Sequence, residues 1–532
     1  AAGAVPQGNS GTSLNGACKI QGKRVLVMEN IQLLLEGFQV ALSVPNLISA
    51  LFGAIMGLIV GAVPGIGSLA GVALLLPLTF RMNPTTAIIA LAALYYSNMY
   101  GGAFSAILLN IPGDSPAVMT ALDGYPLARS GKAGLALSTS IISSFIGGTI
   151  GIIILTIFGP LLARWGLNFG PGELTLLILF AMTSIGWLLG ENPSTGLVAT
   201  GMGIMFATVG VDMAMGMPRF DFGSVHLLSG IPFIPLVIGM FGFSQVIDMV
   251  VNKEKYVSVG VQKVSFRSRM MTRDELKRIT PPSIRHGILG TFVGVMPGAG
   301  ATAASFLSYV IEKRINKNRD MIGKGSIEGM AAAESSNNGA AMGAFAPLLT
   351  LGIPGGGTTA VLLGGLMMWG LRPGPLLFRE NPDFVWGLIS SMYIGNIICL
   401  VIAFASIPLM MRVVRVPASV MIPVISVVCV IGTYTVNNSL FDVYLMIAMG
   451  ILSYFMSVAG IPTAPLLLTF VLTPMLEGYV RRAFDISRGS LDIFVGSNIA
   501  RVLLALTVIF CLSPIVMNLI QKRKAKNGEA AA

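Results

Sequence analysis

Long apolar runs separated by short polar segments dominate the chain from residue 45 onwards. A helix needs roughly 20 apolar residues to cross the hydrocarbon core of a bilayer. Ten runs approach or exceed this length, and we expect a spanning helix in each: 45–63, 86–111, 134–160, 172–190, 194–212, 231–251, 384–411, 417–434, 440–460 and 494–519. Six shorter apolar pieces lie between them: 66–80, 286–296, 299–311, 339–352, 358–371 and 462–475. These predict half-helices or re-entrant hairpins, whose irregular backbone is tolerated in a membrane only against protein or water.

Pro-Gly motifs interrupt the apolar pattern in both halves of the chain. Val63-Pro64-Gly65-Ile66-Gly67 resembles Met296-Pro297-Gly298-Ala299-Gly300, and each is followed by an Ile-Pro-Gly, at Ile111-Pro112-Gly113 and Ile353-Pro354-Gly355. Pro removes a backbone donor and Gly permits positive φ, so each motif predicts a helix broken at hydrophobic depth. Paired breaks in two halves are typical of the binding site of a transporter.

The two halves can be aligned by counting. At an offset of 233 residues, six of the eleven positions from Gly57 to Gly67 are identical in the second half. At an offset of 242, Gly101 matches Gly343 and the two Ile-Pro-Gly motifs coincide. The order of elements is therefore repeated, which indicates a duplication. The series Gly53, Gly57, Gly61 at steps of four predicts a face on which another helix packs closely.

Composition agrees with a membrane protein, because 54% of the residues are hydrophobic, 11% are charged and the mean hydropathy is +0.80. The net charge of +11 lies largely in short segments between apolar runs, which favours membrane orientation over nucleic-acid binding. Residues 253–285 carry nine Lys or Arg against three acids, a net charge of +6, so we expect this segment in the cytoplasm. The same rule suggests the same side for the tail (Lys522, Arg523, Lys524, Lys526) and for Arg412, Arg415, Arg481 and Arg482.

These patterns divide the chain into five segments. Residues 1–27 lack the apolar core of a signal peptide and are interpreted as a leader that precedes a start at Met28. The others are a first transmembrane repeat (28–252), a basic cytoplasmic linker (253–284), a second transmembrane repeat (285–520) and a cytoplasmic tail (521–532). The predicted fold is an all-α polytopic membrane helix bundle with two structural repeats, broken helices and re-entrant hairpins.

The helix breaks suggest how the protein could bind ions. A helix start presents unpaired N–H groups and about half a positive charge, so half-helices that point at one cavity can bind an anion without Lys or Arg. The break motifs contain no basic residue, and the carbonyls at the other end of a broken helix can hold a cation. Small polar side chains near the breaks offer further hydrogen bonds, although they could equally satisfy backbone groups that the breaks leave free. Asp123 and Glu334 are the nearest acids and are candidates for a coupling proton, with Asp123 interpreted rather as fixing a loop.

Several of these stretches resemble the large membrane subunit of the tripartite tricarboxylate transporters: 61–67, 96–113, 123–126, 131–133, 334–338 and 349–355. Weaker similarity at 171–173, 209–212 and 218–223 extends the resemblance over nearly all of 30–520. It implies a bacterial inner-membrane secondary transporter that imports di- or tricarboxylates with an ion gradient by alternating access. It also implies inverted repeats, a small integral membrane subunit and a periplasmic substrate-binding protein as partners.

The resemblance and the break chemistry together give a list of expected site residues. For the carboxylate they are Pro64, Gly65, Gly67, Ser68, Pro112, Gly113, Ser115, Pro297, Gly298, Gly300, Thr302, Pro354, Gly355, Gly356, Thr358 and Thr359. For the coupling ion, Na⁺ or H⁺, they are Asn337, Asn338 and Asp114. The family often has a small hydroxyl residue where this chain has Asp114, and a negative charge there would oppose a bound anion.

Other classes of function were weighed. A gradient-independent anion channel would suit an apolar bundle, but duplicated breaks favour a single enclosed site. Gly323-Lys324-Gly325-Ser326 lacks the spacing of an ATP-binding phosphate loop. His226 and His286 have no paired ligand at a usable spacing and are interpreted as interfacial, and the four Cys are scattered. We therefore expect neither an enzyme nor a bound metal or organic cofactor.

Overall fold

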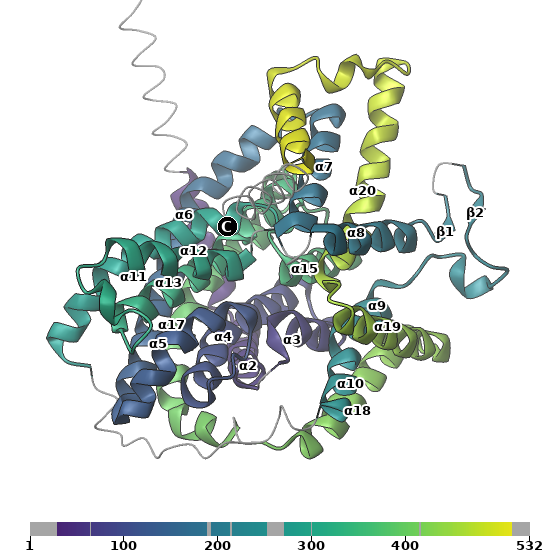
Figure 1. Cartoon of the computed structure of the whole chain (residues 1–532). Coiled ribbons are helices and arrows are strands. Elements are labelled where there is room, and N and C mark those ends of the chain that lie inside the picture. The colour runs from purple at the N-terminus through teal and green to yellow at the C-terminus, as the bar shows by residue number, and fades with distance from the viewer. Residues whose placement is uncertain are drawn as a thin grey trace, which may run out of the picture.

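The structure is a computed structural model, described over residues 29–63, 65–188, 193–212, 215–252, 271–298, 300–413 and 416–512. Helices make up nearly all of it (Figure 1), which confirms the predicted all-α bundle. Seven of the described helices are long and apolar enough to cross a membrane, so the chain is a multi-pass membrane protein. The predicted leader and tail, and residues 253–270 of the predicted linker, lie outside the described residues.

The first half begins with a helix over residues 29–41. It continues with α2 (Val44–Ala62), α3 (Gly67–Leu75), α4 (Pro84–Leu109), α5 (Val118–Leu127), α6 (Ala133–Gly166), α7 (Pro171–Leu188), α8 (Pro193–Ala207), α9 (Phe233–Val237) and α10 (Ser244–Val251). Short turns of 3-10 or π helix extend some of them: η1 (Leu76–Thr79), η2 (Ser115–Ala117), η3 (Ala128–Lys132) and η5 (Ile238–Phe243). The segments α9, η5 and α10 follow one another directly and together form one candidate membrane span, Phe233–Val251.

The second half has a matching order of elements. They are α11 (Arg273–Val295), α12 (Gly300–Ile315), α13 (Ile327–Gly343), α14 (Phe345–Leu351), α15 (Gly357–Met368), α16 (Leu377–Glu380), α17 (Pro382–Val413), α18 (Ala418–Asn437), α19 (Leu440–Val458) and α20 (Thr463–Ser487), followed by a helix at Asn498–Leu512. α3, α12 and α15 are the short helices expected next to breaks. The separate pieces expected at 286–296, 339–352 and 462–475 are instead parts of α11, of α13 with α14, and of α20.

Hydropathy underestimated the length of α13 because its polar residues belong to the packed interior. Glu334 and Asn338 of α13 are both 0% exposed. The start of α11 also corrects the linker boundary at 284. Thr272 and Glu275 form a capping box at the N-terminus of α11, so the helix begins at Arg273, inside the predicted linker.

Close helix pairs form the centre of each half. A Cβ on Gly53, Gly57 or Gly61 of α2 would lie 2.1–2.3 Å from a backbone carbonyl oxygen of α4. In the second half, Gly290 and Gly294 of α11 meet carbonyl oxygens of α13 in the same way, both at 2.2 Å. The predicted packing face is confirmed, and it recurs in the duplicate.

Gly57→Ala should therefore destabilise the protein. The new methyl group would meet the Leu94 carbonyl oxygen at 2.3 Å, so α2 and α4 must separate, at a cost of about 1–3 kcal/mol. Gly201→Ala is the matched control, since its Cβ would have nothing within 4 Å and α8 would gain up to about 1 kcal/mol of helix propensity. Melting curves of the detergent-solubilised variants should move in opposite directions.

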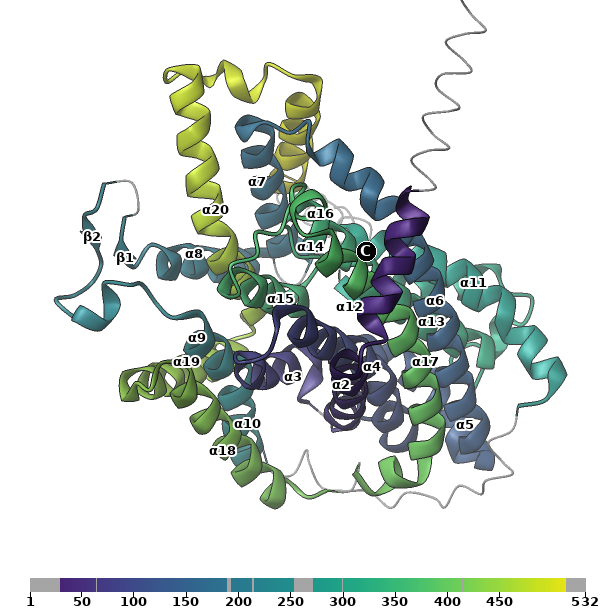
Figure 2. The ribbon, with the colours of Figure 1, turned by 180° about the vertical axis from the view of Figure 1, so that it is seen from behind.

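Each half contributes a long helix that packs against helices of the other half. α6, from the first half, packs on α11 and α13, whereas α17, from the second, packs on α2 and α4 (Figure 2). Likewise α20 packs on α7 and α8, and α18 and α19 pack on η5 and α10. The two repeats are thus interlocked in one bundle.

The two repeats run in opposite directions. Asp123, near the end of α5, accepts hydrogen bonds at 2.8–2.9 Å from the backbone N–H groups of Gly323, Gly325 and Ser326, just before α13 begins. The passage α4–break–α5 therefore ends beside the start of its duplicate, α13–α14–break–α15. This contact confirms the inverted arrangement, and Asp123 fixes a loop as interpreted from the sequence.

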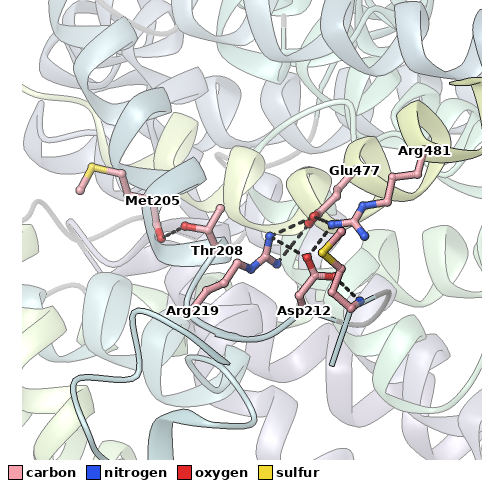
Figure 3. A network of polar contacts seen from close by, with 7 residues as sticks. Met205, Thr208, Asp212, Arg219, Glu477 and Arg481 are labelled. Atoms are coloured by element: carbon pink, nitrogen blue, oxygen red, sulfur yellow. Dashed lines mark hydrogen bonds and ion pairs between the residues drawn. The ribbon is translucent and has the colours of Figure 1, made fainter. Parts of the chain in front are cut away.

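A short hairpin connects α8 to α9, with β1 (Gly210–Val211) antiparallel to β2 (Pro218–Arg219). Arg219 donates to both carboxylate oxygens of Glu477 at 3.0 and 3.3 Å, and Arg481 donates to Asp212 and Glu477, both at 2.6 Å (Figure 3). The hydrogen bond to Glu477 raises the pKa of Arg219 further, so the guanidinium stays charged at any physiological pH. These ion pairs attach the hairpin to α20.

The hairpin also helps to assign the helix ends to the two sides of the membrane. The candidate span Phe233–Val251 leads from the hairpin to Asn252, so the hairpin and Asn252 lie on opposite sides of the membrane. We call the side of Asn252 the linker side. Arg481 contacts the hairpin and therefore lies on the other side, so the expectation that Arg481 shares the linker side is wrong.

Candidate binding site at the helix breaks

Four breaks interrupt the bundle: the first and second Pro-Gly breaks (63–66 and 296–299) and the first and second Ile-Pro-Gly breaks (110–114 and 352–356). Pro64 and Ala299 lie outside the described residues. Residues at equivalent positions of the two halves adopt the same left-handed backbone conformation. In the Pro-Gly breaks, φ is 87° at Gly65 and 78° at Gly298; in the Ile-Pro-Gly breaks, it is 60° at Asn110 and 69° at Gly352. The duplicated motifs therefore fold alike, and α4 and α14 both end in a left-handed residue.

Within each half, the Ile-Pro-Gly break rests against the helix that ends at the Pro-Gly break. A Cβ on Gly113 would lie 1.9 Å from the Gly61 carbonyl oxygen, and a Cβ on Gly355 would lie 2.7 Å from that of Gly294. In the second half, Gly298 N–H donates to the Gly355 carbonyl at 3.1 Å. Glycine is required at 113 and 355 because backbone occupies the space of a side chain.

The breaks of opposite halves also meet. The hydroxyl oxygens of Ser68 and Thr358, in the first turns of α3 and α15, are 3.0 Å apart. Ser305 of α12 donates to the Pro116 carbonyl of η2 at 3.0 Å. Half-helix starts that are 290 residues apart in the sequence therefore lie side by side, as a shared anion site would require.

Asp114 occupies one of these helix starts. Its Oδ2 accepts from Ser68 N–H at 2.9 Å and from the Asn98 amide at 3.0 Å, and its Oδ1 accepts from Ser115 N–H at 2.8 Å. The carboxylate thus sits at the N-terminus of α3, where the partial positive charge favours it. Asp114 takes the place that a substrate carboxylate could have taken in the first half.

The second half has no such group. At the offset of 242, the equivalent of Asp114 is Gly356. A Cβ built there would lie 3.7 Å from the Cα of Gly300, at the start of α12. Gly356 is extended (φ −173°), so its backbone does not require glycine. Its N–H donates to Thr359 Oγ1 at 2.9 Å, which caps α15. The start of α12 therefore faces position 356 without a carboxylate.

A cavity of ≈ 510 Å³ extends from the first-half breaks toward the linker side. Gly65, Gly67, Pro112, Gly113, Asp114 and Ser115 line it together with Ser244, Gln245 and Asp248 of α10, Ser453 and Ser457 of α19, and Thr463. None of its described lining residues is Lys, Arg or His. Two carboxyl groups among hydroxyls and an amide favour a cation over an anion in this cavity.

The other expected residues are distributed around this centre. Pro297 accepts a hydrogen bond from Ser184 of α7 at 3.1 Å, and Pro354 and Thr358 are buried. Thr302 lies in the first turn of α12, next to the second Pro-Gly break, and is exposed.

Asn337 and Asn338 lie in the middle of α13 rather than at a break, and both are buried. Asn338 donates to the Glu334 carbonyl at 3.2 Å, and the Oδ1 of each Asn has no donor among the described residues. No described hydrogen bond joins either amide to Asp114. In the described hydrogen bonds, Asp114 and the two Asn residues therefore belong to different networks.

Glu334 extends the α13 group. Its carboxyl is 0% exposed and accepts from Thr120 of α5 and, at 2.9 Å, from Ser144 of α6. No Lys, Arg or His in the described part of the chain forms an ion pair with it. Asn98, Thr120, Ser144 and Asp248 escaped the sequence analysis. Isolated polar residues within apolar runs were the only available signal for them.

His226 is exposed, whereas His286 is buried. His226 stacks on Phe441 with ring centroids 4.7 Å apart. His286 is 0% exposed on α11, and its Nε2 lies 2.9 Å from Glu312, which also pairs with Arg285. His286 therefore has a carboxylate partner on another helix, Glu312 of α12, which the spacing in the sequence did not reveal.

Comparison with known proteins agrees with this architecture. The pattern of the Tripartite tricarboxylate transporter TctA family matches residues 47–468. A relative from Agrobacterium vitis, described as an uncharacterized 52.8 kDa protein in the TAR-I ttuC' 3' region, is 41% identical over 484 residues, covering 90% of this chain and 95% of the relative. A second, described as an uncharacterized protein in the TAR-II ttuC' 3' region, is 42% identical over 234 residues, 44% of this chain and 97% of the relative. No solved structure matches. The family pattern covers most of the chain, which therefore belongs to the tripartite tricarboxylate transporter TctA family.

Proposed function

We propose that this chain imports di- or tricarboxylates, citrate among them, by alternating access driven by a Na⁺ or H⁺ gradient. Its family consists of membrane subunits of tripartite transporters, which implies a membrane partner and a binding protein. In the proposal, it acts in a bacterial inner membrane with a small integral membrane subunit and a periplasmic substrate-binding protein that delivers the carboxylate. The linker side is then the cytoplasmic side.

One observation carries the proposal: inverted repeats bring their half-helix starts together, with Ser68 of α3 and Thr358 of α15 3.0 Å apart. In transporters built from inverted repeats, discontinuous helices hold the substrate at the interface between the repeats. A bundle whose helices are exchanged between halves can move one group of helices against the other around that point.

The second half is the proposed carboxylate site. The start of α3 already holds the carboxylate of Asp114, whereas the start of α12 faces Gly356. A substrate carboxylate would accept hydrogen bonds from backbone N–H groups at the helix starts, near Gly300 and Gly357. Asp114 would then direct the anion to the second half, because two carboxylates at one helix start repel each other.

We assign binding of the coupling ion to the two polar groups of the structure that favour positive charge. Asp114 and the cavity beside it form one such group, and Asn337, Asn338 and Glu334 on α13 form the other. An ionisable residue at membrane depth is a functional candidate by default. The cavity opens toward the linker side, which corresponds to an inward-facing state in this proposal.

Reconstitution tests the proposal. The complete tripartite complex in proteoliposomes should accumulate labelled citrate or another carboxylate against its gradient when an inward Na⁺ or pH gradient is imposed, and collapse of that gradient should stop the accumulation. Uptake that only equilibrates the carboxylate and ignores both gradients would support the alternative, an anion channel.

A further inference from the structure

A groove of ≈ 480 Å³ separates α5 of the first half from α12 of the second. Its α12 wall is formed by Phe306, Tyr309, Val310, Lys313 and Arg314, and its α5 wall by Met119 and Leu122. The α12 residues follow the spacing i, i+3, i+4, i+7, i+8, which places them on one face of the helix. The groove therefore runs along the helix axis.

The groove is apolar along its length and cationic at one end. Phe306 and Leu122 are 55% and 45% exposed, so its walls face outward from the bundle. Lys313 and Arg314 are exposed, and no ion pair engages either one within the described residues. Eight residues separate Phe306 from Arg314, which is about 12 Å along a helix.

The cationic end lies on the linker side. α12 begins at the second Pro-Gly break, inside the bundle, and its last turns lie beside α11, where Arg285 pairs with Glu312. α11 itself begins next to residues 253–270, so α11 and α12 form a re-entrant hairpin whose two ends share that side. The charges are thus at the membrane surface, with the apolar walls deeper.

We propose that this groove binds an anionic phospholipid. One acyl chain would lie against Leu122, Phe306 and Val310, and the headgroup phosphate would lie between Lys313 and Arg314. Charge complementarity selects an anionic over a zwitterionic lipid, since each basic residue near the surface adds attraction to a negative headgroup. The apolar walls distinguish the site from one for free phosphate.

The position of this lipid gives it a structural role. It would bridge α5 and α12, next to the contact in which Ser305 donates to Pro116. A lipid seated there joins the two repeats close to the breaks. The assignment rests on the groove alone and does not depend on the proposed transport cycle.

A tryptophan at position 306 can report occupancy, because Phe306 is exposed and an aromatic ring fits there. The full-length Phe306→Trp protein is reconstituted in phosphatidylcholine vesicles containing a minor fraction of phosphatidylglycerol with brominated acyl chains, which quench a neighbouring indole. The four native Trp give a background, which the protein without the substitution measures. We expect about tenfold preference for brominated phosphatidylglycerol over brominated phosphatidylcholine at this position.

Two charge variants in this background provide the comparison. In the double variant Lys313→Ala, Arg314→Ala, the preference for brominated phosphatidylglycerol over brominated phosphatidylcholine should disappear, as expected if the lipids mix at random around the protein. Lys317→Ala with Arg319→Ala removes the same charge from the adjacent loop but leaves the groove intact, so the preference should persist. All four positions are exposed, and unchanged melting temperatures confirm folding.

Two results would overturn the assignment. Equal quenching by the two brominated lipids would show that the groove does not select charge. An equal loss of preference in both double variants would show general attraction to the basic surface. As a further check, millimolar glycerol phosphate should leave the quenching unchanged, whereas its displacement of the lipid would identify a phosphate site.

Discussion

Gly356→Asp should abolish carboxylate uptake. The substitution places a carboxylate at the start of α12, where Asp114 has no counterpart and where the substrate carboxylate is proposed to bind. Two negative charges about 4 Å apart repel by about 4 kcal/mol at an effective dielectric constant of 20, which corresponds to an affinity loss of about 1,000-fold. Initial uptake rates at fixed substrate concentration in the reconstituted complex would measure it, and we expect a reduction of at least about 100-fold.

Gly356→Ala is the control for this prediction. Its extended backbone accepts any residue, and the new Cβ would make only ordinary contact with Gly300 at 3.7 Å, so uptake should stay within about twofold. Gly355 is a poor position for such a test, since any side chain there meets backbone at 2.7 Å and disturbs the fold. Normal uptake by folded Gly356→Asp would remove the start of α12 from the site.

Asp114→Asn should uncouple transport from the ion gradient. The amide removes the negative charge that balances a cation in the adjacent cavity, and it leaves one acceptor oxygen for three donors. Each charge-assisted hydrogen bond contributes about 1.5–3 kcal/mol, so the break is also loosened locally. We expect gradient-driven uptake to fall at least about tenfold, while exchange of internal for external carboxylate stays within about threefold.

The comparison of net uptake with exchange separates coupling from structure. If Asp114 only caps α3, both activities should fall together with the melting temperature. Asp248→Asn provides a comparison within the same cavity: it removes the second carboxyl without touching a break, so it should also lower gradient-driven uptake if the cavity holds the coupling cation. Unimpaired gradient-driven uptake by Asp114→Asn would exclude Asp114 from coupling.

Local patterns were sufficient for much of the fold. Proline and glycine affect the backbone wherever they occur, so the breaks at Gly65, Gly113, Gly298 and Gly355 could be predicted from residue type alone. The glycine face of α2 was also predictable, because a period of four on a helix aligns small residues whatever they pack against. Hydropathy located most spans for the same reason.

Predictions failed where polarity and position were set by distant residues. The start of α11 was missed because its first turns carry exposed charged residues, and the length of α13 was misjudged because Glu334 and Asn338 are polar but buried. The partner of His286 was missed because Glu312 lies on another helix, 26 residues away. Arg481 was assigned to the linker side although Asp212, 269 residues away, holds it on the other.

By itself, the sequence determined that this is a duplicated, all-helical membrane protein with paired breaks, because these properties follow from residue type, spacing and local backbone chemistry. Only the tertiary structure decided how the breaks differ. The contact of Asp114 with Ser68 joins residues 46 apart, and that of Ser68 with Thr358 joins residues 290 apart. Such contacts depend on how inverted repeats pack, and this packing fills one helix start with the chain's own carboxylate while the other faces Gly356.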